Sequence, residues 1–217
     1  MNRIDKTIGW ADWSWNPIKG MCKNDCSYCY AKRIYKRFKL NSEVRFDEKE
    51  LLRPYKLKKP SKIFVCSTHE IFGKWIPNEW IFKILKVAED NPRHTFLFLT
   101  KKPNRYSSFD YPKNCWLGVT YTDFSERWKI ATILKYYHSN ITFISLEPLL
   151  TNKCFTDYLF LSHWLIIGGL TPKPIHKTKW IDIIVIQAKK LNIPIYVKDN
   201  AKYDKTIKES PIIESEE

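Results

Sequence analysis

Three cysteines near the start of the chain have the residue type and spacing to do chemistry. Residues 22–30 read C-K-N-D-C-S-Y-C-Y, so Cys22, Cys26 and Cys29 form a C-x3-C-x2-C pattern. Thiolates are soft ligands, and at this spacing one short loop can direct all three at a single metal centre. A [4Fe–4S] cluster held by three cysteines leaves one iron able to bind a substrate or cofactor. The pattern therefore predicts a reactive iron–sulfur site.

Three other uses of this loop are open. The thiols could bind structural zinc with a distant histidine as fourth ligand, for example His69 or His94. Two of them could form a disulfide and leave a spare thiol, or all three could be unrelated core residues. The remaining cysteines are scattered among apolar segments, where we expect buried thiols: Cys66, Cys115 and Cys154.

Length and composition indicate one globular domain. The chain has 217 residues, of which 44% are hydrophobic, and this is enough for one ample core. The longest clean apolar run, residues 164–170, is too short to span a bilayer, and the first residues, M-N-R-I-D-K, carry no apolar signal segment. We therefore expect a cytoplasmic protein with no membrane contact. It should have a single domain over residues 1–206 and an acidic flexible tail over 207–217.

The net charge of +14 favours a polyanionic partner such as nucleic acid. The stretch Lys32–Lys62 holds twelve Lys and Arg residues against four Asp and Glu, which gives 12 − 4 = +8. Aromatic residues are interleaved with these charges, which suits phosphate contacts plus base stacking: Tyr35, Phe38, Phe46 and Tyr55. We predict that this stretch binds nucleic acid. The alternatives are a solvated helix face with its aromatic residues in the core, or a biased genome.

The apolar pattern predicts alternating strands and helices. Strands are expected over residues 8–12, 62–67, 95–100, 115–121, 141–146, 164–167 and 193–197. Helices are expected over residues 31–40, 77–89, 155–161 and 177–191 and from a capping box at 123–126 to about 137, with a basic connector over 41–61. Continuously apolar strands that alternate with helices argue for a parallel sheet buried on both faces. We predict an α/β fold, a partial (β/α)6–7 TIM-like barrel with parallel strands, with a doubly wound sheet as the alternative.

Polar residues and glycines follow the expected strands. In such a barrel the chemistry sits at the carboxyl ends of the strands. The cysteine loop follows the first expected strand, so we expect it to share one mouth with these residues. The candidates for contact with a cofactor or substrate are Ser67, Thr68, Glu70, Thr100, Lys101, Thr120, Glu147, Gly168, Gly169 and Lys198. Each of them also has a purely structural interpretation, as a cap, an ion pair or a turn.

Several segments, in the same order along nearly the whole chain, resemble a known family. They are W-N-P-I-K-G (15–20), the cysteine loop with Y-A-K-R (30–33), V-C-S-T-H-E-I-F (65–72), F-L-F-L-T-K-K-P (96–103), W-L-G-V-T (116–120), I-S-L-E-P-L-L (144–150), I-I-G-G (166–169) and I-P-I-Y-V-K (193–198). They resemble the blocks of an uncharacterised, phage-associated family of three-cysteine proteins related to the radical S-adenosylmethionine (AdoMet) superfamily. The loop, with Tyr28 before its third cysteine, resembles the superfamily signature C-x3-C-x-Φ-C and is similar to that of spore photoproduct lyase.

The resemblance implies a partial (β/α) barrel that holds a [4Fe–4S] cluster and AdoMet. It implies that Cys22, Cys26 and Cys29 bind three irons and that AdoMet binds the fourth. An electron donor would then supply the electron that cleaves AdoMet to methionine and a 5′-deoxyadenosyl radical.

The resemblance also implies roles for residues at the strand ends. Superfamily members commonly hold the methionine amino group with a Gly-Gly-Glu, and that position here reads Ser67-Thr68-His69-Glu70, which gives the carboxylate without the glycines. Other contacts would come from Ser67, Thr100, Lys101, Glu147 and Lys198, with a close backbone approach at Gly168 and Gly169. We predict a radical AdoMet enzyme that acts on nucleic acid, in modification or repair. The alternatives are a non-catalytic, metal-stabilised nucleic-acid-binding module and a radical AdoMet enzyme with a small-molecule or protein substrate.

Overall fold

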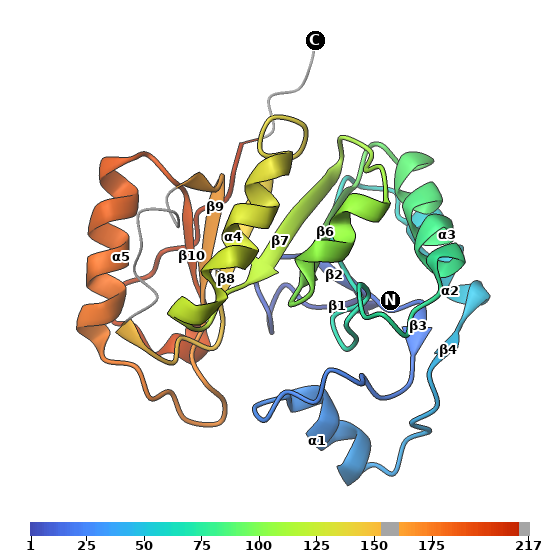
Figure 1. The fold of residues 1–217 in the computed structure, drawn as a ribbon, viewed down its shortest axis with the longest axis horizontal. Coiled ribbons are helices and arrows are strands. Elements are labelled where there is room, and N and C mark those ends of the chain that lie inside the picture. Colours follow the sequence, from blue (N-terminus) through green and yellow to red (C-terminus); the bar gives the residue numbers. More distant parts are fainter. Residues whose placement is uncertain (153–160, 213–217) are drawn as a thin grey trace. The chain divides into compact units, whose positions relative to one another are not determined.

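The chain folds into two compact units, Met1–Val119 and Thr120–Glu217, in a computed structural model that describes residues 1–152 and 161–212. Each unit combines parallel strands with helices (Figure 1), so the predicted α/β class with parallel strands is confirmed. The sequence predicts one domain over residues 1–206, and that assignment stays a prediction.

The first unit is built on parallel strands. β2 (Trp13–Trp15), β5 (Lys62–Val65), β6 (Thr95–Thr100) and β7 (Cys115–Thr120) pair in this order, and each pair is parallel. Every residue of β7 is buried, and so is every residue of β6 except Leu99. This is the pattern of strands covered on both faces. Two short antiparallel pairings join β1 (Asn2–Arg3) to β2, and β3 (Ile18–Lys19) to β4 (Arg45–Phe46).

Helices of the first unit are α1 (Tyr30–Arg37), α2 (Glu48–Leu51) and α3 (Asn78–Glu89), with 3-10 turns over Pro54–Lys56 and Pro103–Ser108. α3 starts directly after Pro77, whose fixed backbone angle suits a helix start. It buries Ile81, Ile84, Leu85 and Ala88, which recur with the helical period. The predicted helix over 77–89 is therefore confirmed.

The second unit repeats the same architecture. β8 (Thr142–Leu146), β9 (Trp164–Ile167) and β10 (Ile195–Val197) pair in this order and are parallel. All of their residues are buried. In its described residues the helices are α4 (Arg127–Ile133) and α5 (Thr178–Lys190), with 3-10 turns over Phe124–Glu126, Leu134–Tyr136 and Asp199–Ala201. The strands predicted over 141–146, 164–167 and 193–197 are confirmed to within two residues.

The first predicted strand, residues 8–12, is wrong. The carbonyl of Ile4 accepts the N–H groups of Thr7, Ile8 and Gly9, at 3.0, 2.9 and 3.0 Å, and Gly9 has a φ of 84°, so the chain turns here. The strand begins later, at Trp13, where Trp13–Trp15 pairs with residues 63–65. The alternating tryptophans indicated a strand, but its start is set by the turn chemistry around Gly9.

The segment over 41–61, expected to be a connector, contains regular structure, because β4 and α2 lie within it. The chain beyond 206 is also packed, at least at its start. The N–H of Val197 donates to the carbonyl of Ile207 at 2.9 Å, and the N–H of Ile195 donates to the carboxylate of Glu209 at 3.0 Å. Ile207 is buried, so these first residues of the expected tail are held against β10.

Some predictions fall on residues that the structure does not describe. The helix expected over 155–161 lies there except for its last residue, and so does Cys154. Within the described ranges, no helix is long and apolar enough to cross a membrane.

One side chain in the first unit holds three backbone carbonyls. The amide nitrogen of Asn114, just before β7, donates to Ala88 at 2.9 Å, Asn91 at 3.1 Å and His94 at 2.9 Å. We expect Asn114→Ala to lower the free energy of unfolding by about 1–3 kcal/mol, because each of these carbonyls loses the hydrogen bond from the Asn114 amide. Urea unfolding followed by tryptophan fluorescence measures this loss. Asn104→Ala, at an exposed position of the same unit, is the control, and an equal loss in both variants would contradict the assignment.

Candidate metal centre

The cysteine loop presents its first two sulfur atoms to N–H donors. Cys22 Sγ accepts the backbone N–H groups of Asn24 at 3.4 Å and Glu70 at 3.3 Å. Cys26 Sγ accepts the side-chain amide of the same Asn24 at 3.2 Å. Asn24 therefore bridges two of the three thiols, and Glu70 ties the loop to the chain that follows β5. Burial raises the pKa of the Cys22 thiol, and the two N–H donors oppose that shift.

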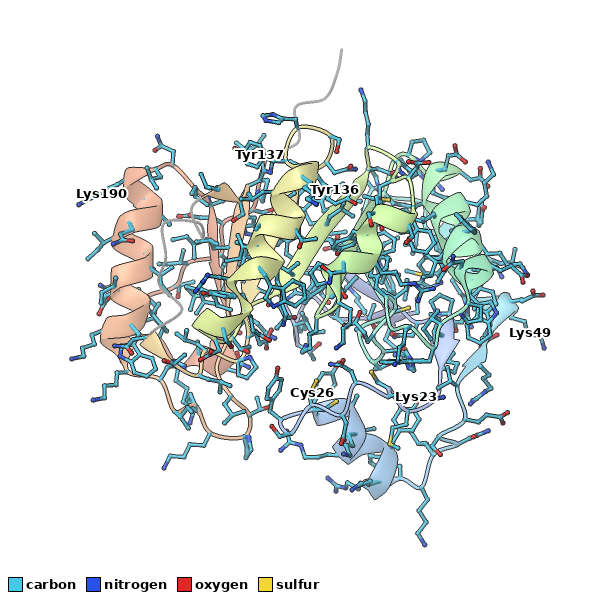
Figure 2. All side chains as sticks on the ribbon, viewed as in Figure 1. Lys23, Cys26, Lys49, Tyr136, Tyr137 and Lys190 are labelled. Atoms are coloured by element: carbon cyan, nitrogen blue, oxygen red, sulfur yellow. The ribbon has the colours of Figure 1, made fainter. Side chains whose placement is uncertain are left out.

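The third cysteine begins α1. Cys29 is the N-cap residue of this helix, and its Sγ accepts the N–H of Lys32 at 3.4 Å. A thiol thus takes the place that a serine or aspartate oxygen commonly fills. The first helical residue, Tyr30, donates its hydroxyl to the carbonyl of Ser67 at 3.0 Å. Figure 2 shows Cys26, with Lys23, on the loop that runs into α1.

Glu70 joins the ends of two strands. It is buried, and its Oε2 accepts the N–H of Lys101 at 2.7 Å, while its Oε1 accepts the Thr100 hydroxyl and the N–H of Phe72. Its own N–H donates to Cys22. One residue therefore links the cysteine loop, the chain after β5 and the end of β6.

Asn16, directly after β2, forms hydrogen bonds with two further predicted site residues. Its Oδ1 accepts the Ser67 hydroxyl at 3.2 Å, and the backbone N–H and hydroxyl of Thr68 at 3.3 Å each. The predicted residues thus form two hydrogen-bonded groups, Asn16 with Ser67 and Thr68, and Glu70 with Cys22, Thr100 and Lys101. That these groups contact a cofactor or substrate stays a prediction.

His69 is engaged on both sides of its ring. Nε2 accepts the indole N–H of Trp75 at 3.1 Å, and Nδ1 faces the carbonyl of Gly20 at 3.4 Å. The ring is therefore neutral with its proton on Nδ1, and the nitrogen that could bind zinc is occupied. Burial lowers the pKa of His69. The zinc alternative with His69 as fourth ligand does not fit this geometry.

A single metal ion and an iron–sulfur cluster make different demands on the three thiols of the loop. Within residues 1–152 and 161–212, no group of three or more His, Cys, Asp and Glu side chains is placed to hold one metal ion. A [4Fe–4S] cluster makes a different demand, because each of its cysteines binds a different iron. Three thiols on one short loop, each with an N–H donor, suit such a cluster, since hydrogen bonds to the sulfurs stabilise their anionic form. The donor set fits an iron–sulfur cluster.

In the second unit, the predicted residues form their own group. Glu147 Oε1 accepts the ammonium of Lys198 and the amide of Asn200, the latter at 3.4 Å. The same Asn200 amide also donates to the Gly169 carbonyl at 2.9 Å, and its oxygen accepts the Gly169 N–H at 3.2 Å. The half-buried pair Glu147–Lys198 and the clamp on Gly169 together fix the ends of β8, β9 and β10.

Both glycines of the pair are required by close approach of the protein itself. A Cβ atom on Gly168 would lie 2.7 Å from Cδ of Glu147, and one on Gly169 would lie 2.4 Å from the carbonyl oxygen of Asn200. The groups that approach the two glycines are the side chain of Glu147 and the backbone of Asn200, and a close approach of AdoMet to this backbone stays a prediction. Thr120, at the end of β7, is buried. That all of these strand ends share one mouth stays a prediction.

Three residues of the site were missed by the sequence reasoning: Asn16, Asn24 and Asn200. Each is a short amide next to a predicted feature, Asn16 in the W-N-P-I-K-G segment, Asn24 between two of the cysteines and Asn200 two residues after Lys198. A polar amide that follows a strand or sits inside a metal loop is a usable signal, because it can satisfy backbone groups that the loop leaves unpaired.

The chain belongs to the family described as protein of unknown function (DUF5131), whose sequence profile matches residues 5–212. No curated protein matches the sequence. The phage association and the three-cysteine character predicted for the family stay predictions.

Two solved structures have a similar fold. One is a spore photoproduct lyase mutant with bound AdoMet and dinucleoside spore photoproduct, at 12% identity and a TM-score of 0.55, covering 83% of this chain and 62% of that chain. The other is spore photoproduct lyase complexed with dinucleoside spore photoproduct, at 11% identity and a TM-score of 0.50, covering 80% of this chain and 60% of that chain. This chain thus spans less than two thirds of their length. At these identities the similarity shows the fold alone, which is consistent with a partial TIM-like barrel.

The neutral, buried His69 makes stability depend on pH. Because its pKa is lowered in the folded protein, the unfolded chain takes up a proton near pH ~6.5 that the folded protein does not, so stability falls as pH falls through this range. We expect His69→Gln to reduce this fall by up to about 1.4 kcal/mol per pH unit. Urea unfolding at several pH values measures it. Burial also lowers the pKa of His94 and His163, so part of the slope persists.

His138→Gln is the control for this experiment, since this histidine is exposed. Identical pH slopes for wild type and His69→Gln would contradict the neutral, doubly engaged ring.

Proposed function

We propose that this chain is a radical AdoMet enzyme that carries a [4Fe–4S] cluster and acts on nucleic acid. One observation carries the proposal: the three sulfurs of the C-x3-C-x2-C loop each accept an N–H, and the loop is bonded through Glu70 to the polar ends of β5 and β6. The similarity in fold to a lyase with bound AdoMet supports it.

Cys22, Cys26 and Cys29 would hold three irons and leave the fourth for AdoMet. When bound and reduced by an electron donor, the cluster supplies one electron that splits AdoMet into methionine and a 5′-deoxyadenosyl radical. The protein's task is to position these groups. Asn24 holds two of the sulfurs in register, and the Cys29 cap fixes the third at the start of α1.

The strand ends of the first unit would hold the methionine part of AdoMet. A carboxylate has about four acceptor sites, and Glu70 uses three of them within the protein. The remaining one can accept the methionine amino group. Ser67, Thr68 and the Thr100 hydroxyl offer polar contacts nearby, and the Lys101 ammonium, 5.9 Å from the Tyr28 ring centroid, offers a charge for a carboxylate.

The strand ends of the second unit carry the remaining candidates for contact with a ligand. Lys198 is held by Glu147 and presents its remaining ammonium protons to a carboxylate of AdoMet or substrate. Gly168 and Gly169 add no side chain of their own to this region, where Glu147, Asn200, Pro174 and His176 already approach them. Thr120 is the proposed contact from the end of β7.

The basic charge supports nucleic acid as the substrate class, because a polyanion balances a net charge of +14. The two neighbouring structures are complexes with dinucleoside spore photoproduct, and this supports a nucleic-acid substrate class. A modification or repair reaction in the cytoplasm is the corresponding proposal. A reaction on a base or sugar would need the target nucleotide outside its stack.

Loss of any one loop cysteine should abolish the cluster. We expect Cys22→Ala, Cys26→Ala and Cys29→Ala each to remove the brown absorbance and the acid-labile sulfide of anaerobically reconstituted protein, because each thiol binds its own iron. Iron, zinc and sulfide analysis measures this.

Cys66→Ala and Cys115→Ala are the matched controls and should keep the cluster. Both thiols are buried, and burial raises the pKa of Cys66 to about 12, so they are not available as thiolates. Loss of the cluster in Cys115→Ala with retention in all three loop variants would overturn the assignment. Stoichiometric zinc without sulfide would favour the non-catalytic module.

Cluster-loaded protein reduced with dithionite should release 5′-deoxyadenosine from AdoMet. We expect Glu70→Ala to weaken AdoMet binding about ten-fold or more while the iron content persists, because the backbone N–H to Cys22 survives the change. Equilibrium dialysis and chromatography of the products measure both effects. Glu89→Ala, on the exposed surface of α3, is the control. Wild-type protein with a full cluster that neither binds nor cleaves AdoMet would refute the proposal.

A further inference from the structure

The apolar face of α1, which a helix normally buries, is exposed to solvent. Of its eight residues only Ala31 is buried. Tyr30 is 44% exposed, Ile34 is 42% exposed, and Phe38, the C-cap residue, is 61% exposed. These three follow one another at a spacing of four residues, so they form one stripe along the helix. The sequence left open whether these apolar side chains enter the core, and the structure excludes that for Phe38.

Positive charge flanks this stripe. Residues 30–40 contain five Lys and Arg residues and no Asp or Glu. The guanidinium of Arg37 lies 5.4 Å from the centroid of the Phe38 ring, and Lys36 and Lys39 are exposed. The ammonium of Lys32 pairs with the carboxylate of Asp25. The face therefore combines apolar side chains with positively charged ones.

The helix is fixed next to the cysteines. Cys29 caps it, Tyr30 bonds to Ser67 at the end of β5, and the Tyr35 hydroxyl accepts the N–H of Gly20 at 3.0 Å. These contacts hold its first two turns, and Phe38 is the C-cap residue at the other end of the helix. Figure 1 shows α1 apart from α2 and α3 of the same unit. A ligand on α1 would lie beside the cysteine loop.

We infer that the stripe Tyr30–Ile34–Phe38 is a docking surface for single-stranded or locally opened nucleic acid. Exposed bases would stack on Phe38 and lie over Ile34, and the phosphates would contact Lys36, Arg37 and Lys39. A closed duplex hides its base faces, so this surface favours unpaired nucleotides. The inference rests on the proposed function for the choice of nucleic acid as the ligand. It extends that proposal by assigning the nucleic-acid strand to a particular surface of the protein.

Two other occupants fit the surface less well. A second copy would bring five like charges against five, which opposes association. An anionic membrane would attract the charge, but eight helical residues with a stripe of three apolar side chains bury little area in a bilayer. Both become outcomes of the experiment.

Fluorescence anisotropy of a labelled 20-nucleotide single strand and its duplex, with full-length protein purified anaerobically, tests the inference. We expect tighter binding to the single strand, with an affinity that falls as salt rises. Phe38→Ala should weaken single-strand binding about five-fold to hundred-fold, the range for one stacked base. Phe38→Trp, which keeps an aromatic ring at this position, should bind the single strand as tightly as wild type does. Phe82→Ala, 53% exposed on α3, is the matched control and should bind as wild type does.

The salt dependence of single-strand binding tests whether the lysine and arginine side chains of α1 contact phosphates. A plot of the logarithm of the binding constant against the logarithm of the salt concentration has a slope set by the number of phosphate contacts. Lys36→Gln and Arg37→Gln should each reduce the magnitude of this slope by about 0.7, the value for one contact with a single strand. Lys190→Gln, an exposed lysine on α5 that is labelled in Figure 2 and lies outside the stretch Lys32–Lys62, should leave the slope unchanged. Circular dichroism of each variant checks that α1 and the fold persist.

Several results would overturn the inference. They are unchanged binding in Phe38→Ala, an equal loss in Phe82→Ala, or preference for the duplex. Association with phosphatidylserine vesicles but not with the oligonucleotide would identify a membrane surface, and a Phe38-dependent dimer would identify a second copy. The proposed function fails on other grounds: wild-type protein without iron and sulfide that still binds the single strand would refute the enzyme and keep the docking surface.

Discussion

A buried carboxylate must find its hydrogen-bond donors inside the protein, and Glu70 shows how this requirement organises the first unit. Its oxygens accept from Phe72, Thr100 and Lys101, which brings the loop after β5 against the end of β6. Its backbone N–H donates to Cys22 Sγ, so the same residue also connects these strand ends to the cysteine loop. The geometry of the candidate metal centre therefore depends on a carboxylate that is largely satisfied before any ligand binds.

The second unit meets the same requirement with an ion pair. Glu147 is half-buried and is paired with Lys198, and Asn200 binds both the carboxylate and the backbone of Gly169. Gly168 is needed because the Glu147 side chain lies where a Cβ would be. Each unit thus uses one acidic residue to fix its strand ends. Polar atoms held in this way are preorganised, which lowers the cost of binding a charged ligand.

Strongly periodic segments were predicted well, and short elements were not. β6, β9 and α3 appear where their apolar runs predicted them, because burial on both faces or on one stripe leaves a clear pattern. The first strand was misplaced, since the turn at Gly9 outweighs the alternation of the tryptophans. β4 and α2 were missed because elements of two and four residues are too short to show a periodic pattern of apolar residues.

The sequence by itself determined the chemistry on offer: the spacing of the three cysteines, the polar residues after each strand, and the positive charge around α1. These are properties of neighbouring residues, so the chain order contains them. Only the tertiary structure decided the partners. It gave Asn16 and Asn24 their roles, occupied both nitrogens of His69 and left Phe38 exposed. Hydrogen bonds and exposure depend on which distant segments meet, and no local pattern in the sequence specifies that meeting.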